Sequence, residues 1–314
     1  MENFSKKQLF YKKNADRRKH LCYNTFPVSY FNRIIPEVKN IRTLFVSDLD
    51  GTLLNSKKKI PEEGQKIFNS QRVKGQLFTI ATARSAASAQ EYYEALGLAL
   101  PAVLMNGVFV YDFHRKVYLH KNPIPREAAC EALAELSKRK IWPFLFTLEG
   151  EELCAEFVRL NNPEMESFYL ERKDKSYKRF GPVERFADHE EVCMVYISVI
   201  DTEEKLRPVF EWARKHPELS ASLYRDNYSD HWYLEVYSVK ADKAAGIAWL
   251  KQYTGADRVV VFGDNYNDIQ MLKSADEGYV VTEAPESVKA YATGVIGSSE
   301  ESAVPRFIEA YPLK

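Results

Sequence analysis

Two aspartates, Asp48 and Asp50, stand one residue apart after the apolar run Leu44-Phe45-Val46 and directly before Gly51. The apolar run predicts a buried strand, and the glycine allows a sharp turn after it. Carboxylates at a buried strand end are unfavourable unless a cation or a reaction uses them, because burial and mutual repulsion oppose their charged forms. The simpler alternative is a turn with two solvated acids, since Asp and Gly are common turn residues.

Polar side chains also follow two other predicted strands. Thr82 follows one of them, and Asp264, Asn267 and Asp268 follow the other. In a parallel sheet the carboxyl ends of the strands meet at one edge, where ligands bind. Several carboxylates at that edge would raise one another's pKa, and a set of oxygen donors without His or Cys favours Mg²⁺. The sequence therefore predicts a magnesium site there.

A positive charge is also available for anionic chemistry. Lys243 begins the helix that precedes the Asp264 strand, from where it can hold a phosphate oxygen. Backbone N–H groups around Leu49-Asp50 and Asp264-Asn265 can add an anion-binding nest. Taken singly, Lys243 is a solvated helix residue and Thr82 a strand-end cap, but together with the aspartates they predict phosphate chemistry.

The elements that must position these residues show an α/β rhythm from residue 41 onward. Apolar runs predict strands near residues 43–48, 76–81, 102–105, 258–262 and 278–282. Periodicity, Pro61 at a helix start and Gly97 at a helix end predict helices near residues 61–73, 86–96, 242–253, 268–275, 285–292 and 301–310. Strands that alternate with helices predict a parallel sheet.

The middle of the chain has a different character. Residues 113–233 contain alternating strand-like runs such as 193–199 and helical stretches near 125–140 and 203–215. This pattern predicts an inserted α+β domain. The predicted domains are a core of residues 41–112 and 234–314, the insert at 113–233, and an extension at 1–40.

Composition limits the classes of function. The chain has 314 residues, enough for two domains, and its 44 basic residues equal its 44 acidic ones. This balance gives no reason to expect nucleic acid as a partner, and no apolar stretch is long enough to span a membrane. The N-terminus lacks the apolar core of a secretory signal, and the four cysteines are far apart. We therefore expect a reduced, cytoplasmic setting; the oligomeric state is open.

The extension at residues 1–40 is basic and rich in aromatic residues. Such an arm can contact RNA or an acidic partner, or it can be a loosely packed extension. The second interpretation is favoured, because no periodicity or motif supports the first.

The polar residues resemble the four motifs of the haloacid dehalogenase superfamily. These motifs are Asp48-x-Asp50-Gly51-Thr52, Thr82, Lys243 and Gly263-Asp264-x-x-Asn267-Asp268, and the resemblance extends over most of residues 43–310. The long insert resembles the Cof-like branch, subclass IIB, with its C2B-type α+β cap, and Pro101–Gly107 resembles the segment before that cap. The resemblance implies a Rossmann-like core with a parallel sheet and an inserted cap domain.

The resemblance also implies catalytic roles. Asp48 would be the nucleophile that forms an aspartyl-phosphate, and Asp50 the general acid and later the base. Lys243 would neutralise charge on Asp48 and on the phosphate. The implied phosphate-binding residues are Asp48, Leu49, Asp50, Thr82, Lys243 and Asn267.

A magnesium ion is implied as the cofactor. Its ligands would be the Asp48 carboxylate, the Asp50 backbone carbonyl and the Asp264 carboxylate. Asn267 and Asp268 would lie around these ligands and orient Lys243, metal-bound water or the phosphate.

Two positions depart from the pattern of the branch. Ala83 stands where Gly usually follows the Thr of the second motif, although Arg84 is retained. Glu283, in Thr282-Glu283-Ala284, stands where Asn is common. Its carboxylate either adds negative charge near the site or points to solvent.

The leading hypothesis is a Mg²⁺-dependent phosphatase that acts on a small phosphorylated metabolite, with a sugar phosphate as one candidate. One alternative is a phosphohexomutase, against which the Cof-like fourth motif argues. Another is a non-catalytic regulatory or binding module, against which the complete motif set argues. Specificity should lie in the cap, where the aromatic residues around Phe144, Phe168-Tyr169 and Tyr177 are predicted to be core rather than a substrate wall.

Overall fold

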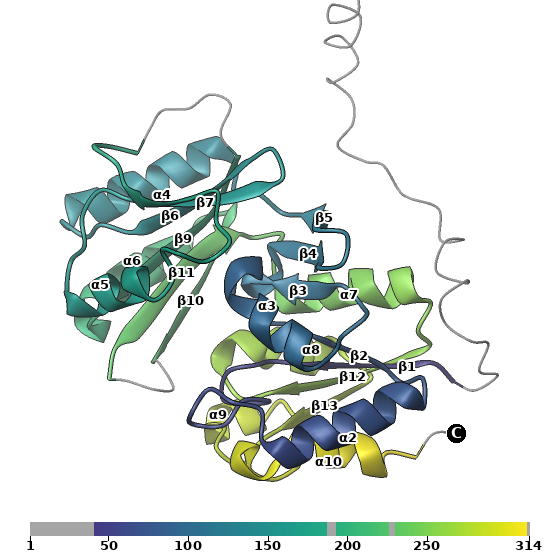
Figure 1. The fold of residues 1–314 in the computed structure, drawn as a ribbon. Helices are drawn as coiled ribbons and strands as arrows, with labels where there is room; N and C mark the ends of the chain where they lie inside the picture. Colours follow the sequence, from purple (N-terminus) through teal and green to yellow (C-terminus); the bar gives the residue numbers. More distant parts are fainter. Residues whose placement is uncertain (1–40, 187–192, 226–229, 313–314) are drawn as a thin grey trace, which may run out of the picture. The chain divides into compact units, whose positions relative to one another are not determined.

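The computed structural model describes residues 41–186, 193–225 and 230–312 (Figure 1). The predicted N-terminal extension lies outside these residues. Within them no helix has both the length and the apolar character that a membrane crossing requires.

A parallel sheet forms the core of the described chain. Its strands, in spatial order, are β14 (Gly294–Val295), β13 (Glu277–Val280), β12 (Arg258–Gly263), β1 (Thr43–Ser47) and β2 (Leu77–Ile80). All neighbouring pairs are parallel, and Val46 pairs with Val261. Every residue of β1 is buried, as expected for a central strand with both faces covered.

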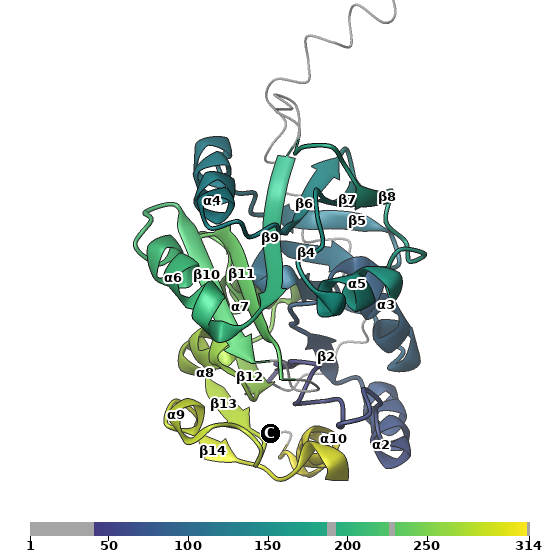
Figure 2. The ribbon, with the colours of Figure 1, turned by 90° about the vertical axis from the view of Figure 1, so that its left-hand side faces the viewer.

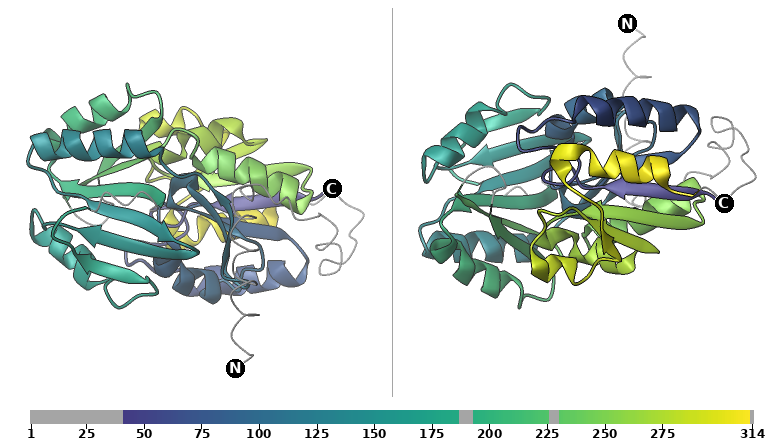
Figure 3. Two further views of the ribbon diagram at one scale, coloured as in Figure 1. Left: turned by 90° about the horizontal axis from the view of Figure 1, so that it is seen from above. Right: turned by 90° about the horizontal axis from the view of Figure 1, so that it is seen from below.

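Helices cover both faces of this sheet. They are α2 (Glu62–Val73), α3 (Ala86–Ala95), α7 (Lys243–Thr254), α8 (Ile269–Ser274), α9 (Glu286–Lys289) and α10 (Ala303–Ala310). In Figure 1, α2 and α10 lie below the sheet and α7 above it. Figure 3 shows α10 beside α2, where Arg306 and Glu63 form an ion pair of 2.7 Å. The predicted α/β fold is confirmed, and each predicted core strand and helix is present within a few residues of its expected bounds.

A second sheet forms the cap. Its strands, in spatial order, are β10 (Leu219–Arg225), β11 (Trp232–Ser238), β9 (Cys193–Asp201), β6 (Phe144–Glu149), β7 (Glu152–Phe157) and β8 (Arg179–Pro182). Helices α4 (Arg126–Lys138) and α6 (Glu203–Ala213) pack on one face, and α5 (Pro163–Leu170) lies on the other (Figure 2). Because side chains alternate along a strand, Ile197 and Val199 of β9 face α4 and α6, whereas Tyr196 and Ser198 face the opposite way.

A small antiparallel sheet joins the two larger ones. It contains β3 (Ala102–Leu104), β4 (Phe109–Asp112) and β5 (Val117–Lys121), with the 3₁₀ turn η3 (Met105–Gly107) between β3 and β4. A parallel bridge between Ala81 and Val103 attaches it to the core sheet.

A hairpin and a strand near the insert extend across the predicted domain limits. The hairpin of β4 and β5 crosses the limit at residues 112/113, and β11 crosses the limit at 233/234. Hydrogen-bonded pairing with distant strands decides where each element belongs, and a local pattern does not contain that information.

Candidate active site

Three strand ends bring their polar residues to one edge of the core sheet. The backbone N–H of Asp48 donates to the carbonyl of Phe262 (2.9 Å), and that of Ala81 donates to the carbonyl of Ser47 (2.9 Å). Asp48, Thr82 and Asp264 therefore follow β1, β2 and β12 at the same edge, at a point where the strand order changes direction.

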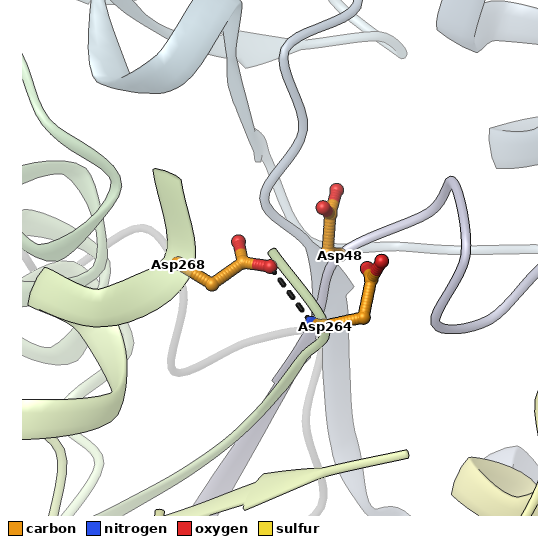
Figure 4. Close-up of side chains that lie close together, drawn as sticks. All are labelled: Asp48, Asp264 and Asp268. Carbon is orange, nitrogen blue, oxygen red and sulfur yellow. Dashed lines mark hydrogen bonds between the residues drawn. The ribbon is translucent and has the colours of Figure 1, made fainter. Parts of the chain in front are cut away.

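Three carboxylates lie side by side at this edge (Figure 4). Oxygens of Asp48, Asp264 and Asp268 lie within 4.8 Å of one another, and all three residues are buried. Burial raises the pKa of Asp48 to about 7, and repulsion from Asp268 and Asp50 adds to it while Lys243 opposes it. Burial, followed by repulsion from Asp268 and Asp48, raises the pKa of Asp264 well above its ordinary value.

Lys243 lies between two of these carboxylates. Its side chain is 0% exposed, and its Nζ lies 2.9 Å from Asp48 Oδ2 and 2.7 Å from Asp268 Oδ1. Burial by itself lowers the pKa of Lys243, but the two carboxylates outweigh burial and hold the pKa above its ordinary value. Lys243 is the first residue of α7, whose N-cap Asp242 accepts a hydrogen bond from the backbone N–H of Ala245.

Asp268 shapes the loop after β12 as well as orienting Lys243. Its Oδ2 accepts hydrogen bonds from the backbone N–H of Asp264 (2.9 Å) and of Asn265 (3.0 Å). Gly263 permits this arrangement, because a Cβ at that position would lie 2.7 Å from the Asp268 side chain. Both oxygens of Asp268 are thus engaged, which suits the predicted orienting role better than metal ligation.

Asp50 is held by a residue to which sequence reasoning gave no role. Arg84 donates from Nε to Asp50 Oδ2 and from Nη2 to Asp50 Oδ1, both at 2.7 Å. Gly51 turns the chain with φ of +79°, and Asp48 Oδ1 accepts the backbone N–H of Leu49 (2.7 Å). The retained Arg84 was the only sequence signal for this pair.

Thr52 is a second residue of the site to which the sequence alone assigned no role. Its Oγ1 donates a hydrogen bond of 2.6 Å to Asp264 Oδ1, and the residue is 1% exposed. The hydroxyl fixes the position of this Asp264 oxygen. Its position in the first motif was the available signal.

The remaining predicted residues also reach this edge. Thr82 is buried, and its Oγ1 accepts the backbone N–H of Arg84 (3.2 Å). Asn267 Nδ2 donates to Asn106 Oδ1 (3.1 Å). Asn267 Oδ1 is buried and has no hydrogen-bond partner within the described part of the chain.

Asn106 connects this edge to the cap. It lies in η3 with a left-handed backbone (φ 54°, ψ 33°), and its Nδ2 donates to Tyr196 OH (2.8 Å) and to Glu235 Oε2 (2.7 Å). Burial raises the pKa of Glu235, and hydrogen bonds from Tyr196, Tyr224 and Asn106 oppose that rise. Sequence reasoning missed Glu235, because a single Glu within an apolar strand gives no chemical signal.

The two departures from the motif pattern have different surroundings. Ala83 lines the cavity over the edge. The exposed Glu283 accepts hydrogen bonds from Thr282, Ser298 and Ser299. Glu283 is not among the residues that line the cavity. Its carboxylate instead connects the loop after β13 to the turn at Ser298 and Ser299.

The site residues fit a divalent cation. Among the four buried side chains at the centre, three are acids and only Lys243 is a base. The donors are all oxygens, as a hard cation requires, and Asn267 Oδ1 adds a buried acceptor that has no hydrogen-bond partner among the described residues.

A cavity above the carboxylates is lined by both domains. The core contributes Asp48, Asp50, Thr82, Arg84, Asn265 and Asn267, and the cap contributes Phe146, Phe168, Tyr177, Tyr196, Tyr224 and Tyr233. The prediction that the aromatic residues around Phe168 and Tyr177 belong to the cap core is confirmed. Both pack against the apolar core, but both also line the cavity.

Comparisons with known proteins agree with this geometry. The sequence model of the haloacid dehalogenase-like hydrolases matches residues 45–308. A pyridoxal phosphate phosphatase of Escherichia coli is 26% identical over 280 residues, which cover 84% of this chain and 96% of the relative. A 5-amino-6-(5-phospho-D-ribitylamino)uracil phosphatase of Bacillus subtilis is 25% identical over 276 residues, or 86% of this chain and 96% of the relative.

Solved structures show the same fold. A haloacid dehalogenase-like hydrolase from B. subtilis superposes with a TM-score of 0.70 at 22% identity, covering 85% of this chain and 99% of that one. A subclass IIB sugar phosphatase of the superfamily superposes with a TM-score of 0.68 at 22% identity, covering 85% and 98%.

The chain belongs to the haloacid dehalogenase-like hydrolase family, as the sequence predicted. The core sheet with its inserted α+β cap has the fold of the subclass IIB sugar phosphatase with which it superposes. The protein is a phosphatase of that superfamily, a phosphoric monoester hydrolase.

Proposed function

We propose that this protein is a Mg²⁺-dependent phosphatase that hydrolyses a small phosphorylated metabolite through an aspartyl-phosphate on Asp48. The observation that carries the proposal is the buried Lys243, held between Asp48 and Asp268 beside a third carboxylate. Phosphoryl transfer depends mainly on positioning and charge neutralisation, and this cluster supplies both.

The first half-reaction breaks the phosphate ester. A carboxylate oxygen of Asp48 attacks phosphorus, the bond to the leaving oxygen breaks, and Asp50 gives that oxygen a proton. In the second half, Asp50 takes a proton from water, the water oxygen attacks phosphorus, and the bond to Asp48 breaks to release inorganic phosphate. Because Arg84 occupies both oxygens of Asp50 in this structure, these proton transfers would require the pair to open when the substrate binds.

Other residues position the transferred group. Thr82 and the backbone N–H of Leu49 would donate to phosphoryl oxygens, with Leu49 giving up its present hydrogen bond to Asp48 Oδ1, and Lys243 would offset their charge. Asp48 and Asp264 would hold Mg²⁺ together with the Asp50 carbonyl, and Asn267 would bind a metal-bound water. When bound, the ion supplies positive charge that withdraws electron density from the phosphoryl group.

The partner that fits this cavity is a small phosphorylated metabolite. The two curated relatives are named for phosphatase activity on such metabolites, which supports the partner class. Within the described residues, Cys130 and Cys154 are free thiols, which supports the proposed cytoplasmic setting.

The test is phosphate release from a panel of phosphorylated metabolites, with Mg²⁺ and with a chelator. We expect activity only with the metal, and a loss of at least about 10³-fold in Asp48→Asn, which removes the nucleophile without changing its size. Asp276→Asn is the control, because Asp276 is half-exposed, pairs with Lys251 and with the backbone N–H of Val259, and is not among the residues that line the cavity.

Two results would contradict the proposal in different ways. An Asp48→Asn variant that keeps the wild-type rate would exclude the covalent mechanism. Transfer of the phosphoryl group to a second sugar, with little release of inorganic phosphate, would favour the mutase alternative.

A further inference from the structure

A buried carboxylate of the cap is joined to the core of the site by a chain of side-chain hydrogen bonds. Glu235 lies in β11, opposite Ser198 of β9, and is only 5% exposed. Its Oε2 accepts a hydrogen bond of 2.7 Å from Asn106 Nδ2. Asn106 Oδ1 in turn accepts one of 3.1 Å from Asn267 Nδ2. Two amides therefore connect Glu235 of the cap to Asn267, the residue that directly precedes Asp268.

Glu235 fixes the direction of this chain. Burial raises the pKa of Glu235, but hydrogen bonds from Tyr196, Tyr224 and Asn106 favour its charged form. An ionised carboxylate only accepts hydrogen bonds, whereas an amide can present either its NH₂ group or its oxygen. Asn106 therefore turns its NH₂ group to Glu235 and its oxygen to Asn267. For the same reason, Asn267 turns its NH₂ group to Asn106.

The chain ends at Asn267 Oδ1. This oxygen is buried and has no hydrogen-bond partner among the residues that the structure describes, although Asn267 lines the cavity together with Asp48. A buried acceptor without a donor is unfavourable, so the orientation of this amide has a cost unless a ligand of the site uses it. Water bound to a divalent cation is a strong donor, and it pairs with an oxygen but not with an NH₂ group.

We propose that Glu235 is a positioning residue of the active site, which acts through Asn106 to hold the Asn267 amide with its oxygen toward water bound to Mg²⁺. This inference rests on the proposed Mg²⁺-dependent function and gives the cap a part in it. The expected metal ligands Asp48, Asp50 and Asp264 all belong to the core. The affinity of the site for its cation nevertheless depends on a side chain of the cap sheet.

Calorimetry with Mg²⁺ alone, on the intact protein and without substrate, tests this role. Glu235→Gln keeps the size of the side chain but offers an NH₂ group as well as an oxygen, so the direction of the chain is no longer fixed. We expect this variant to bind Mg²⁺ about tenfold more weakly than the wild type, the lower end of the range for groups that orient metal ligands.

Glu156→Gln is the matched control. Glu156 is also a cap carboxylate that is 5% exposed, but it pairs with Arg179 and is not among the residues that line the cavity. Its substitution should leave the affinity for Mg²⁺ unchanged. An effect of Glu235→Gln no larger than that of Glu156→Gln would overturn the inference. A raised KM for a phosphate ester at unchanged Mg²⁺ affinity has the same meaning, because Glu235 would then contact the substrate itself.

A double-variant cycle shows whether Glu235 acts through Asn106. Asn106→Gly keeps the left-handed backbone and removes the amide that joins Glu235 to Asn267. It should weaken Mg²⁺ binding by a similar factor, and Glu235→Gln added to it should have no further effect. A direct effect of the Glu235 charge on the cation would persist in the Asn106→Gly background and would overturn the inference. If Glu235→Gln does not fold, unchanged Mg²⁺ affinity in Asn106→Gly overturns it equally.

Failure of the phosphatase proposal has a separate signature. It appears as no phosphate release from the metabolite panel by the wild-type protein with Mg²⁺. The binding comparison uses no substrate, so the loss of Mg²⁺ affinity in Glu235→Gln and its absence in the Asn106→Gly background support the positioning role whether or not turnover is found. A wild-type protein that binds no Mg²⁺ overturns that role.

Discussion

At the scale of single residues, charge decides what the active site can be. Lys243 is surrounded by carboxylates in a region from which water is excluded, and neither partner reaches solvent freely. An ion pair of this kind adds little net stability when intact, but removal of one member leaves uncompensated buried charge. Lys243 should therefore matter for folding stability in addition to its proposed role in the reaction.

Replacement of this lysine should be costly for the fold. Lys243→Met should lower the free energy of unfolding by about 3 kcal/mol or more at neutral pH, because Asp48 and Asp268 lose their shared cation. Urea denaturation measures the loss.

Lys251→Met is the matched control on the same helix. Lys251 forms a half-exposed ion pair with Asp276 at 3.0 Å, so its loss should change stability by less than about 1 kcal/mol. Equal effects of the two substitutions would show that the buried pairing of Lys243 carries no special energetic weight.

At the scale of elements, the turn η3 is the link between cap and core. Asn106 accepts a hydrogen bond from Asn267 of the core loop and donates to Glu235 and Tyr196 of the cap sheet. The left-handed backbone at Asn106 is one that Asn tolerates better than most residues do. Asn106 therefore combines a left-handed backbone with hydrogen bonds to three partners, and both should affect stability.

Two substitutions at this position separate the backbone from the side chain. Asn106→Gly keeps the left-handed conformation and removes the hydrogen bonds, which should lower stability by about 1–3 kcal/mol. Asn106→Ala should lower it by about 1 kcal/mol more, because alanine adds the backbone penalty.

Urea denaturation of the two variants measures this difference, and the wild-type protein is the reference. An alanine variant as stable as the glycine variant would mean that the turn relaxes to another backbone conformation. The hydrogen bonds of Asn106 would then be its whole contribution.

At the scale of the whole molecule, the carboxylate cluster makes stability depend on pH and on cations. The folded-state pKa of Asp48 is about 7, above the ordinary value of 3.8, and that of Asp264 is raised as well. Between the unfolded and folded values, the folded protein holds a proton that the unfolded chain has released. The stabilisation is complete below the unfolded pKa and is lost as pH rises through about 7.

We therefore predict that the metal-free protein loses a few kcal/mol of stability between about pH 5 and about pH 8. Mg²⁺ should raise the melting temperature more at the upper end of this range, where the carboxylates are ionised and bind a cation. Thermal unfolding in chelator and in excess Mg²⁺ measures both effects.

Asp48→Asn should flatten the pH dependence of the metal-free protein, and Asp276→Asn should leave it in place. A wild-type stability that is constant or rises from about pH 5 to about pH 8 would contradict the account of the cluster.

The sequence by itself determined the parallel core sheet and the reaction class. β1, β2 and β12 are short apolar runs that end in polar residues, and parallel strands must end at one edge. For that reason the order of residues alone is enough to place Asp48, Thr82 and Asp264 together. Lys243 joins them because its helix leads directly into β12.

Only the tertiary structure decided which side chains pair across the site and what the cap presents to it. The bonds between Arg84 and Asp50, between Thr52 and Asp264, and between Asn106 and Glu235 join residues 34, 212 and 129 positions apart. No local pattern encodes such pairs, because they depend on strand register and on how the insert folds back over the core. The same holds for the aromatic residues of the cap that line the cavity, since an aromatic residue in an alternating strand gives the same pattern whether its ring faces a helix or a cavity.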